Sequence, residues 1–386
     1  MFRVTVSLTP AAAAEHGSPL SPAFSMATPL TPYLRALTAS PPTLSAADVR
    51  QCLLSIFTGD VPDVQTAAFL TLIRAHGFDR DPEIVAAAAE TMRGLSRRVE
   101  VADGPYVDVV GTGGDGQNTF NVSTSAGLVA AGMGLRVCKH GNKASTSTSG
   151  AADLLSSLGA SIGAVNPATL PAVLESSAFC FIFAPVFHPI MGKIAPLRRA
   201  LGVPSIFNIL GPLLNPVQTA YRIIGINVPE LGPVFARALL MLDRANGRAS
   251  STMIVWGEEG LDEISPAGRT RFWRIQPGSD DVVEGFLDPV ADFGLPRHEL
   301  STVASGTPGE NALKLNSLLR GALPDGDPIK DYVVMNAAAL SVIAGQSATW
   351  VEGVSRARDA ISSGAALRAT EDYVRATVAA EAAATS

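Results

Sequence analysis

The spacing of hydrophobic residues changes near position 103 of this chain. Between residues 31 and 102, apolar side chains recur every three or four positions, which predicts a small helical domain. Beyond this point, short apolar runs alternate with helical spacing, and Val107 to Val110 is the first such run. Runs of this kind predict buried strands of a mainly parallel central sheet that is covered by helices. We therefore predict an α/β protein with a small N-terminal helical domain (31–102) and a larger α/β domain (103–386).

Capping signals divide the helical domain into separate helices. Ser45, three residues before Asp48, predicts the start of one helix, because a serine hydroxyl can accept a hydrogen bond from a free helix N–H. A second helix begins at or near Asp63 and stops at Gly77, and a third begins around Pro82. Proline suits an early helical position, where its missing N–H costs nothing.

The rest of the chain alternates between strand and helix patterns. Phe179 to Phe183 is apolar enough to be a central strand, and Ser161 to Ala164 is the end of another strand. We expect the segment 165–205 to act as a hinge that packs against the helical domain. Further strands are predicted near 135–138, 223–228, 252–256 and 271–275, and helices near 154–158, 167–176, 205–210, 232–246, 311–319, 330–345 and 351–363.

Composition narrows the class of protein. The 386 residues are 47% hydrophobic and 17% charged, which is a normal globular balance at a length that predicts two domains. The net charge of −6 gives no basic excess for a nucleic-acid backbone, so we expect no nucleic-acid partner. No apolar stretch approaches the ~18 residues of a membrane helix, so we expect no membrane span.

The cysteines and the N-terminal residues bear on the compartment. Cys52, Cys138 and Cys180 are scattered and form no Cys-x-x-Cys pair, which favours a reducing, cytoplasmic compartment. The first thirty residues are rich in proline, alanine and serine and contain one arginine. A transit peptide carries more arginine, so we interpret residues 1–30 as a flexible tail, with an organellar signal as the alternative.

A glycine-rich loop follows the first predicted strand. Gly111 and Gly114, within Gly-Thr-Gly-Gly-Asp, allow a ligand to approach the backbone closely. Ser123 to Ser125 then precede a run of small residues, and their hydroxyls can cap a helix that begins there. The free N–H groups and the dipole at a helix start suit a phosphate group.

A second loop repeats this arrangement. The strand predicted at 135–138 runs into a loop that contains Lys139, His140, Gly141, Asn142 and Lys143, and the hydroxyl cluster 145–149 follows. Lysines serve phosphate as point charges, and hydroxyls donate hydrogen bonds to its oxygens. Loops at the ends of neighbouring parallel strands face one ligand from two sides.

Two interpretations of these loops stay open at this point. A glycine loop after a strand is often a plain turn, and this spacing matches neither the Walker nor the dinucleotide pattern. Asp115 would repel a bare phosphate, but it can accept hydrogen bonds from sugar hydroxyls. The two tandem loops together with this carboxylate favour a sugar-phosphate ligand.

Four further residues could carry chemistry. Asp262 and Glu263 are adjacent carboxylates on a predicted exposed loop, which suits either a magnesium ion held together with substrate phosphates or a solvated acidic turn. His188 precedes a proline, and it is either a ligand contact or a core histidine. Arg198 is either a surface arginine or the fork for a carboxylate substrate.

Several sequence blocks resemble the anthranilate phosphoribosyltransferase family. They are GTGGD, NVST and KHGN, then SIFNILGPLLNP from Ser205 to Pro216, GLDEISP from Gly260 to Pro266 and DYVVMNAAAL from Asp331 to Leu340. The resemblance covers residues 31–366. GTGGD and KHGN are shared in looser form with pyrimidine nucleoside phosphorylases, whereas the Asp262-Glu263 pair and FNILGPLLNP are more specific.

The resemblance implies a nucleoside phosphorylase/phosphoribosyltransferase-like fold and an enzyme of tryptophan biosynthesis. Such an enzyme joins anthranilate to 5-phosphoribosyl 1-diphosphate (PRPP), giving N-(5-phosphoribosyl)anthranilate and diphosphate. The resemblance implies Mg2+ as the cofactor, held by Ser123, Asp262 and Glu263, and a homodimer formed through the helical domain. It assigns no acid or base catalyst. The alternatives are a pyrimidine nucleoside phosphorylase and a catalytically inactive sugar-phosphate-binding module.

The resemblance also assigns binding residues to each substrate. For anthranilate they are Gly111, Asn142, His188 and Arg198. For PRPP they are Gly111, Gly114, Asp115, Thr119, Asn121, Val122, Ser123, Thr124, Lys139, His140, Gly141, Asn142, Lys143, Ala144, Ser145, Thr146, Ser147 and Ala151. The chain departs from the family pattern at Lys143 and Pro204, where arginine is common, and at Ala151, where serine is usual. These departures bear on PRPP affinity more than on activity.

Overall fold

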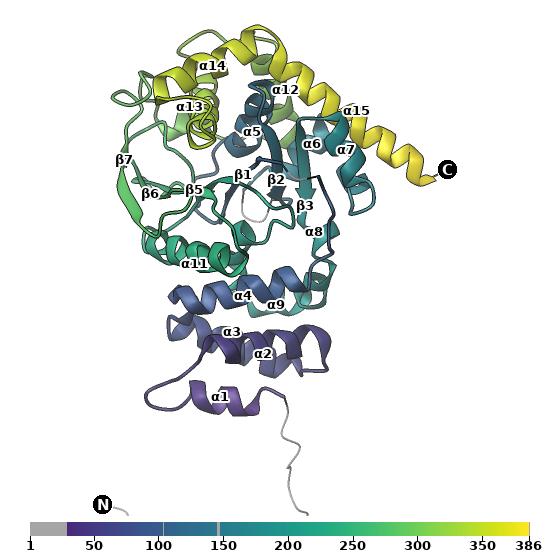
Figure 1. Cartoon of the computed structure of the whole chain (residues 1–386), viewed down its shortest axis with the longest axis vertical. Coiled ribbons are helices and arrows are strands. Elements are labelled where there is room, and N and C mark those ends of the chain that lie inside the picture. The colour runs from purple at the N-terminus through teal and green to yellow at the C-terminus, as the bar shows by residue number, and fades with distance from the viewer. Residues whose placement is uncertain (1–28, 103, 145–146, 386) are drawn as a thin grey trace, which may run out of the picture.

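The computed structural model describes residues 29–385 apart from 103 and 145–146 (Figure 1). The predicted tail therefore lies almost wholly outside the described residues, as do Ser145 and Thr146 of the predicted PRPP set. Four helices stacked at one end of the molecule form the N-terminal domain, and the sheet with its covering helices forms the rest (Figure 1). None of the described helices is long and apolar enough to cross a membrane.

Two helices of the N-terminal domain begin at residues whose side chains cap them. The hydroxyl of Ser45 accepts from the N–H of Asp48, and the Asp48 carboxylate accepts from the N–H of Ser45 at 2.9 Å, so a complete capping box forms. Oδ1 of Asp81 accepts from the N–H of Glu83 at 2.8 Å. The four helices are α1 (Thr31–Leu37), α2 (Ala46–Thr58), α3 (Asp63–Ala75) and α4 (Pro82–Gly94).

Two short helices from later in the chain pack against this domain. Helix α9 (Ala195–Leu201) contacts α3, and α10 (Phe207–Leu210) contacts α4. Ile194, Ile206 and Phe207 share one hydrophobic core with the helical domain. Nζ of Lys193 also donates to the carbonyl of Gly59 at 2.8 Å. The end of the 165–205 segment therefore touches the first domain, while its role as a hinge stays a prediction.

The sheet has seven strands in the order β3-β2-β1-β4-β5-β6-β7. The first five in that order run parallel to one another, β6 runs antiparallel to β5, and β7 runs antiparallel to β6. The strands are β1 (Tyr106–Gly111), β2 (Arg136–Gly141), β3 (Phe179–Phe183), β4 (Tyr221–Gly225), β5 (Ser251–Gly257), β6 (Thr270–Ile275) and β7 (Val282–Leu287).

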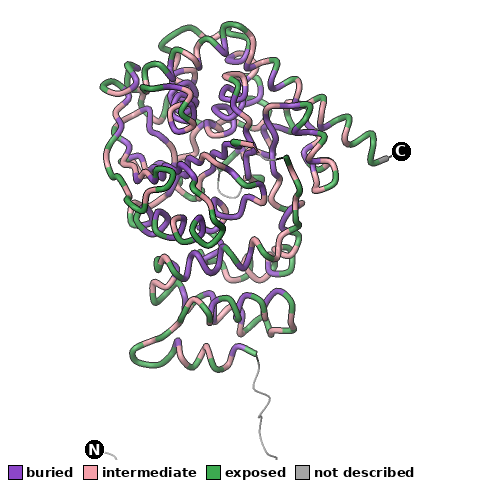
Figure 2. The backbone as a smooth tube through the Cα atoms, in the orientation of Figure 1, coloured by how far each residue is buried: buried purple, intermediate pink, exposed green. Residues whose placement is uncertain are grey.

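Helices cover both faces of this sheet, as predicted. Val109 and Ile223 belong to one core with α5 (Val122–Gly132) and α13 (Pro328–Ile343), whereas Val110 and Ile224 belong to the other core, with α4 and α11 (Leu231–Ala245). Neighbouring residues of one strand thus enter opposite cores, as the period of two requires. Figure 2 shows the buried strands between the two helical layers. The predicted fold class is confirmed.

The remaining α-helices lie in the α/β domain. They are α6 (Ala151–Ser157), α7 (Leu170–Ser176), α8 (Ala184–Phe187), α12 (Pro308–Leu319), α14 (Trp350–Ser362) and α15 (Ala365–Thr385). Strand β7 and helix α15 were not predicted.

Two predictions, one about the residues before β3 and one about β3 itself, are wrong. Ser161 to Ala164 is not a strand end, because Ile162–Ala164 forms a 3-10 helix. Strand β3 lies at the edge of the sheet and not at its centre. Its apolar sequence is explained by the helices α7 and α15 that pack against it. The rings of Phe179 on β3 and Tyr373 on α15 meet edge to face, with centroids 5.0 Å apart.

Candidate active site

The carboxyl ends of β1, β2 and β4 meet at one edge of the sheet, where the loops with the predicted site residues begin. Gly111 on β1 pairs with Gly225 on β4. A Cβ on Gly111 would lie 2.3 Å from Oδ2 of Asp262. A Cβ on Gly225 would lie 1.6 Å from the backbone oxygen of Asp262. The two glycines therefore allow the segment with the acidic pair to cross directly over the strand ends.

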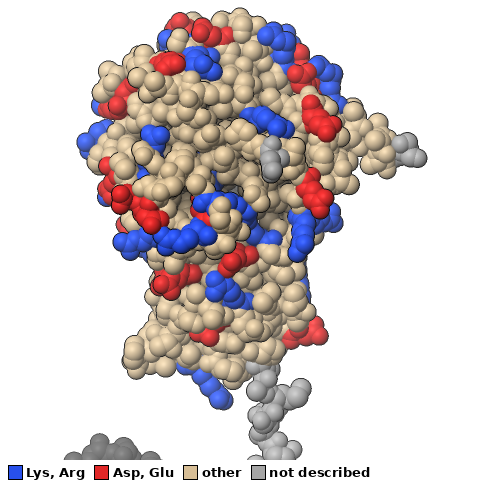
Figure 3. All heavy atoms as spheres, in the orientation of Figure 1, with Lys and Arg blue, Asp and Glu red and all other residues tan. Residues whose placement is uncertain are grey.

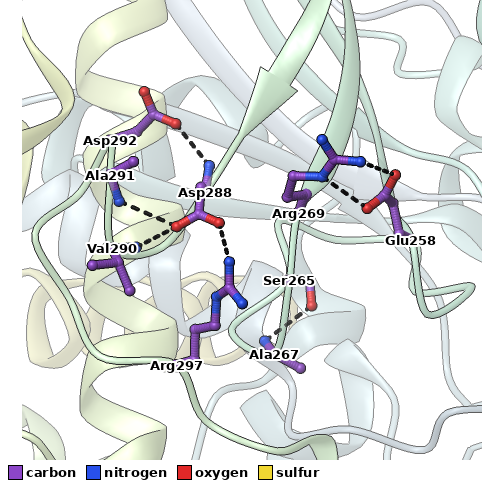
Figure 4. Close-up of polar contacts among 9 residues, drawn as sticks. All are labelled: Glu258, Ser265, Ala267, Arg269, Asp288, Val290, Ala291, Asp292 and Arg297. Carbon is purple, nitrogen blue, oxygen red and sulfur yellow. Dashed lines mark hydrogen bonds and ion pairs between the residues drawn. The ribbon is translucent and has the colours of Figure 1, made fainter.

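Asp262 is held in place by the glycine loop. Its Oδ2 accepts from the N–H of Gly113 at 2.7 Å, and the residue is 8% exposed. The prediction of an exposed loop is wrong for Asp262. Further along the chain, Oγ of Ser265 accepts from the N–H of Ala267 (Figure 4). Glu258, four residues before Asp262, forms an ion pair with Arg269 at 3.1 Å (Figure 4).

The three predicted metal residues lie together. The Ser123 hydroxyl hydrogen-bonds with the Glu263 carboxylate. Burial and the neighbouring Asp115 raise the pKa of Asp262 to about 7. Burial, and next the charge of Asp262, raise the pKa of Glu263 well above its ordinary value. Carboxylates that repel one another in this way form a site at which a cation would relieve the repulsion.

Few protein side chains at this site could coordinate a cation. Among the described residues, no three Asp, Glu, His or Cys side chains converge on one point. A hard cation would therefore take one or two carboxylates from the protein and complete its coordination with other oxygen ligands. This is the way Mg2+ is usually held beside substrate phosphates, so the residues present fit Mg2+.

Lys139 and His140 lie on β2 and not in the loop after it, because the strand continues to Gly141. Nζ of Lys139 donates to the carbonyl of Val109. Burial lowers the pKa of Lys139, while the carboxylates of Asp108, Glu263 and Asp262 oppose this shift. The ammonium thus lies close enough to the acidic pair for their charges to interact.

Asp108 holds β2 in register, a role that was not predicted from the sequence. Its Oδ1 accepts from the N–H of His140 at 3.0 Å, and its Oδ2 accepts from Nδ2 of Asn215 at 2.9 Å. The side chain is fully buried, and burial raises its pKa. A second bond from Nδ2 of Asn215 goes to the carbonyl of Cys138 at 2.8 Å.

Helix α5 begins one residue before the predicted hydroxyl cap. Asn121 is the residue that precedes the helix, and its Nδ2 donates to the carbonyl of Ser149 at 2.6 Å. Oγ of Ser125 donates back to the carbonyl of Asn121 at 3.0 Å. The prediction that Ser123 to Ser125 cap the helix is therefore wrong, since these residues lie inside its first turn.

A cavity of about 260 Å³ lies between the two loops and the acidic pair. Thr124 does not line it, because this side chain is buried in α5 at 1% exposure. The predicted residues that do line it are Gly111, Gly114, Asp115, Thr119, Asn121, Val122, Ser123, Lys139, His140, Gly141, Asn142, Lys143, Ala144, Ser147, Ala151, Asp262 and Glu263.

On the face shown in Figure 3, basic and acidic side chains are interspersed and no large area carries one sign.

A second cavity, of about 390 Å³, adjoins the first. His140 and Asn142 line both cavities. The second is mostly apolar, and it contains the predicted residues His188 and Arg198. Gly111, the fourth residue predicted for anthranilate, lines only the first cavity.

Two histidines meet beside the junction of the cavities. Nε2 of His140 lies 3.2 Å from Nε2 of His188, and Nδ1 of His140 lies 3.1 Å from the carbonyl of Gly211. Burial, and next the charge of the other histidine, lower the pKa of His140 to about 3. Burial likewise lowers the pKa of His188 to about 4. Both rings are neutral at pH 7.

Arg198 on α9 supplies the positive charge of the second cavity. Its Nη2 donates to Oδ1 of Asn208 at 3.3 Å, and its guanidinium lies 5.6 Å from the centre of the Phe207 ring. Burial lowers its pKa. Among the described residues no carboxylate forms an ion pair with this guanidinium, which leaves it available for an anionic group.

Several residues that line the two cavities were not predicted from the sequence. Those missed in the first cavity include Thr112, Gly113, Asn118, Phe120, Ser149 and Gly150, most of which lie inside the two loop motifs. Those missed in the second include Pro185, Met191, Phe207, Gly211 and Leu214. Phe207, Gly211 and Leu214 lie inside the SIFNILGPLLNP block, which could have marked them, whereas Pro185 has the apolar character of a core residue. Of the three departures, Lys143 and Ala151 line the first cavity, and Pro204 lines neither.

Comparison with known proteins places this geometry in a class. Residues 31–96 match the helical bundle domain and residues 103–367 match the a/b domain of a glycosyl transferase family. The anthranilate phosphoribosyltransferase of Schizosaccharomyces pombe is 45% identical, over 86% of this chain and 92% of the relative.

Solved structures agree with the sequence relatives. Anthranilate phosphoribosyltransferase from Saccharomyces cerevisiae in complex with PRPP and Mg has a TM-score of 0.85 at 41% identity, over 91% of this chain and 98% of that one. The same enzyme in complex with 4-fluoroanthranilate has a TM-score of 0.82 at 40% identity and the same coverage. The fold is that of a two-domain glycosyl transferase. Within that class, the chain belongs to the anthranilate phosphoribosyltransferase family.

Proposed function

We propose that this chain transfers the phosphoribosyl group of PRPP to anthranilate, giving N-(5-phosphoribosyl)anthranilate and diphosphate in tryptophan biosynthesis. The observation that carries the proposal is the pair of adjoining cavities that share His140 and Asn142. One cavity is polar and contains the acidic pair, which suits a sugar diphosphate with its cation. The other is apolar with one unpaired guanidinium, which suits an aromatic carboxylate.

The first cavity is the proposed PRPP site. The N–H groups in the first turn of α5 have no partner within the helix, and they can donate to phosphate oxygens together with Lys143 and the Ser147 hydroxyl. Asp115 is placed to accept from sugar hydroxyls. The full PRPP set is the one that the family resemblance assigns; Thr124 is buried in α5 and serves by its backbone N–H.

Mg2+ is the proposed cofactor, and Asp262, Glu263 and Ser123 are the residues that would hold it. The structural relative from Saccharomyces cerevisiae is described as a complex with PRPP and Mg. When bound, the cation neutralises negative charge on the diphosphate leaving group. Lys139, whose charge interacts with both carboxylates, adds positive charge near the same place.

The second cavity is the proposed anthranilate site. Arg198 binds the carboxylate through its planar fork, and the aromatic ring lies among apolar side chains near His188. Asn142, which lines both cavities, lies at the point where the amine of anthranilate must meet the anomeric carbon of PRPP. Holding the two reactants in this orientation lowers the barrier by removing the entropy cost of their encounter.

The reaction needs little acid–base chemistry. The aromatic amine of anthranilate is neutral at pH 7, so it can attack without losing a proton first. His140 and His188 are neutral there and weakly basic, with pKa values of about 3 and 4, so neither is proposed as a proton acceptor. The barrier lies in charge separation between the sugar and diphosphate. Fixed charges and donors around the leaving group supply the stabilisation.

We also propose a homodimer formed through the helical domain and a cytoplasmic location. Val64 on α3 is 75% exposed and Leu54 on α2 is 40% exposed, so this domain presents apolar side chains to a partner. All three cysteines are buried free thiols, in keeping with a reducing compartment. Light scattering after size exclusion, on the wild type and on Val64→Asp, tests the dimer: a monomeric wild type would contradict it.

The loss of anthranilate fluorescence in the presence of PRPP and MgCl2, with diphosphate released in equal amount, tests the function. Uridine with inorganic phosphate is the parallel assay for a pyrimidine nucleoside phosphorylase, an alternative that the comparisons do not favour. Calorimetric binding of PRPP without any diphosphate release would instead identify an inactive binding module.

A further inference from the structure

Asn311 is a fully buried asparagine in the first turns of α12, and no sequence motif marks it. Its Nδ2 donates to Oδ1 of Asn121 and to Oγ of Ser305, each at 2.9 Å. Its Oδ1 accepts from the N–H of Gly306 at 2.9 Å. Both amide hydrogens and the amide oxygen are thus used inside the protein.

The orientation of this amide is set by backbone groups at both ends. The N–H of Gly306 can only donate, so it faces the oxygen of Asn311. The carbonyl of Ser149 can only accept, so it faces the Nδ2 of Asn121 at 2.6 Å. The amide nitrogen of Asn311 must then meet the amide oxygen of Asn121. A directional relay of three hydrogen bonds runs from Gly306 through two side chains to Ser149.

This relay joins segments that are far apart in the sequence. Asn121 ends the glycine loop, and Ser149 ends the second loop of the PRPP cavity. The segment 303–306, just before α12, also pairs with the glycine loop: the N–H of Phe120 donates to the carbonyl of Val303, and the N–H of Ser305 donates to the carbonyl of Asn118, each at 2.8 Å.

The same segment reaches the second loop. Oγ1 of Thr148 donates to the carbonyl of Gly306 at 2.9 Å, and the N–H of Thr148 donates to Oδ1 of Asn118 at 2.9 Å. A capping box between Thr307 and Glu310 fixes the start of α12 and with it the place of Asn311. Helix α12 and the segment before it therefore hold both loops in place.

We propose that Asn311 is a positioning residue that holds the two PRPP loops at a fixed separation before substrate binds. The proposal rests on the PRPP site described under Proposed function. Asn311 does not line either cavity, and it acts through Asn121. A pre-formed pair of loops lowers the ordering cost of binding PRPP. The anthranilate cavity shares only His140 and Asn142 with the PRPP cavity, and its other lining residues come from the segment 184–214.

Asn311→Asp tests this role, because a carboxylate has nearly the same shape but cannot donate to Oδ1 of Asn121. We expect amide hydrogen exchange in residues 112–121 and 147–150, measured without substrates, to quicken about tenfold. We expect the KM for PRPP to rise about tenfold, which corresponds to the loss of one hydrogen bond. The KM for anthranilate should stay within about twofold of wild type, since no hydrogen bond of its cavity changes.

Asn316→Asp is the matched control, because it adds the same charge to the same helix. Asn316 is half-buried, and the structure shows no side-chain hydrogen bond for it within the described residues. This variant should show wild-type loop exchange and wild-type kinetics. Unchanged loop exchange and an unchanged KM for PRPP in Asn311→Asp would overturn the proposal, as would equal effects in the two variants.

A double-mutant cycle separates the relay from general damage to the fold. Asn311→Ala, Asn121→Ala and the double variant, compared by calorimetric PRPP binding, should be non-additive, because each single change breaks the same bond. Additive effects would refute the relay, and the cycle also serves if Asn311→Asp does not fold. A wild type that fails to transfer phosphoribose would refute the proposed function, while loop exchange without substrate would still decide the role of Asn311.

Discussion

Nε2 of His140 lies 3.2 Å from Nε2 of His188, beside the junction of the two cavities. The carbonyl of Gly211, 3.1 Å from Nδ1 of His140, requires a proton on that nitrogen. Nε2 of His140 is then the acceptor, and Nε2–H of His188 is the donor. The hydrogen bond needs a neutral His140, whose Nε2 must accept, and burial keeps both rings neutral at pH 7 by lowering both pKa values.

A pH dependence of stability follows from His188. Its pKa is about 4 in the folded protein and ~6.5 in the unfolded chain, so the unfolded state binds more protons between these values. Stability must therefore fall as the pH drops from 7 toward 4. Between pH 7 and pH 5 the wild type should lose about 2 kcal/mol more unfolding free energy than His188→Gln, which cannot titrate. Urea unfolding at the two pH values measures the difference.

Exposed His76 supplies the control for this titration. His76→Gln should follow the wild type at both pH values. If His188→Gln loses as much stability as the wild type on acidification, His188 is not held neutral by its surroundings.

The acidic pair should determine the response to Mg2+. Asp262→Asn with Glu263→Gln removes both charges while keeping an acceptor for the N–H of Gly113. We expect kcat to fall about 10²- to 10³-fold, as for the loss of a preorganised electrostatic group. Raising MgCl2 should not restore it. Turnover assays over a range of MgCl2 concentrations, with thermal unfolding to confirm the fold, give the answer.

Glu258→Gln is the matched control for the acidic pair, because Glu258 is bound to Arg269 on the outer side of the same segment. It should keep normal turnover and a normal response to Mg2+. Near-normal activity in the double variant at every Mg2+ concentration would remove Asp262 and Glu263 from the metal site.

Arg198 should act on one substrate only. Arg198→Ala removes the unpaired guanidinium of the second cavity, and a hydrogen bond to a charged group is worth ~1.5–3 kcal/mol. We expect the KM for anthranilate to rise about 10- to 100-fold and the KM for PRPP to change little. Arg199→Ala, on the exposed neighbouring position of α9, should leave both constants unchanged. An equal rise in both constants for Arg198→Ala would point to a structural role.

Gly225 should be indispensable for the approach of the acidic pair. A Cβ there would lie 1.6 Å from the backbone oxygen of Asp262, so Gly225→Ala must displace that segment. Overpacking of this kind costs about 1–3 kcal/mol. We expect a lower Tm and weaker activation by Mg2+, measured by calorimetry and by titration with MgCl2. Gly163→Ala, where a Cβ would meet nothing within 4 Å, should behave as wild type.

The sequence by itself determined the elements and the main loops. Hydrophobic spacing predicted strands β1 to β6 and most helices, because periodicity along one element records which of its faces is buried. Glycines, hydroxyls and charges that lie close together along the chain marked the two loops and the acidic pair. Local patterns of this kind are legible without knowledge of the fold.

Tertiary structure decided what depends on neighbours in space. Strand β3 is apolar because α15 covers it, and a sequence shows burial without showing what lies on top. Contacts such as Asp262 with Gly113, His140 with His188, and Asn311 with Asn121 join residues 48 to 190 positions apart. Hydrogen bonds and pKa shifts depend on distances through space, and only the folded chain sets those distances.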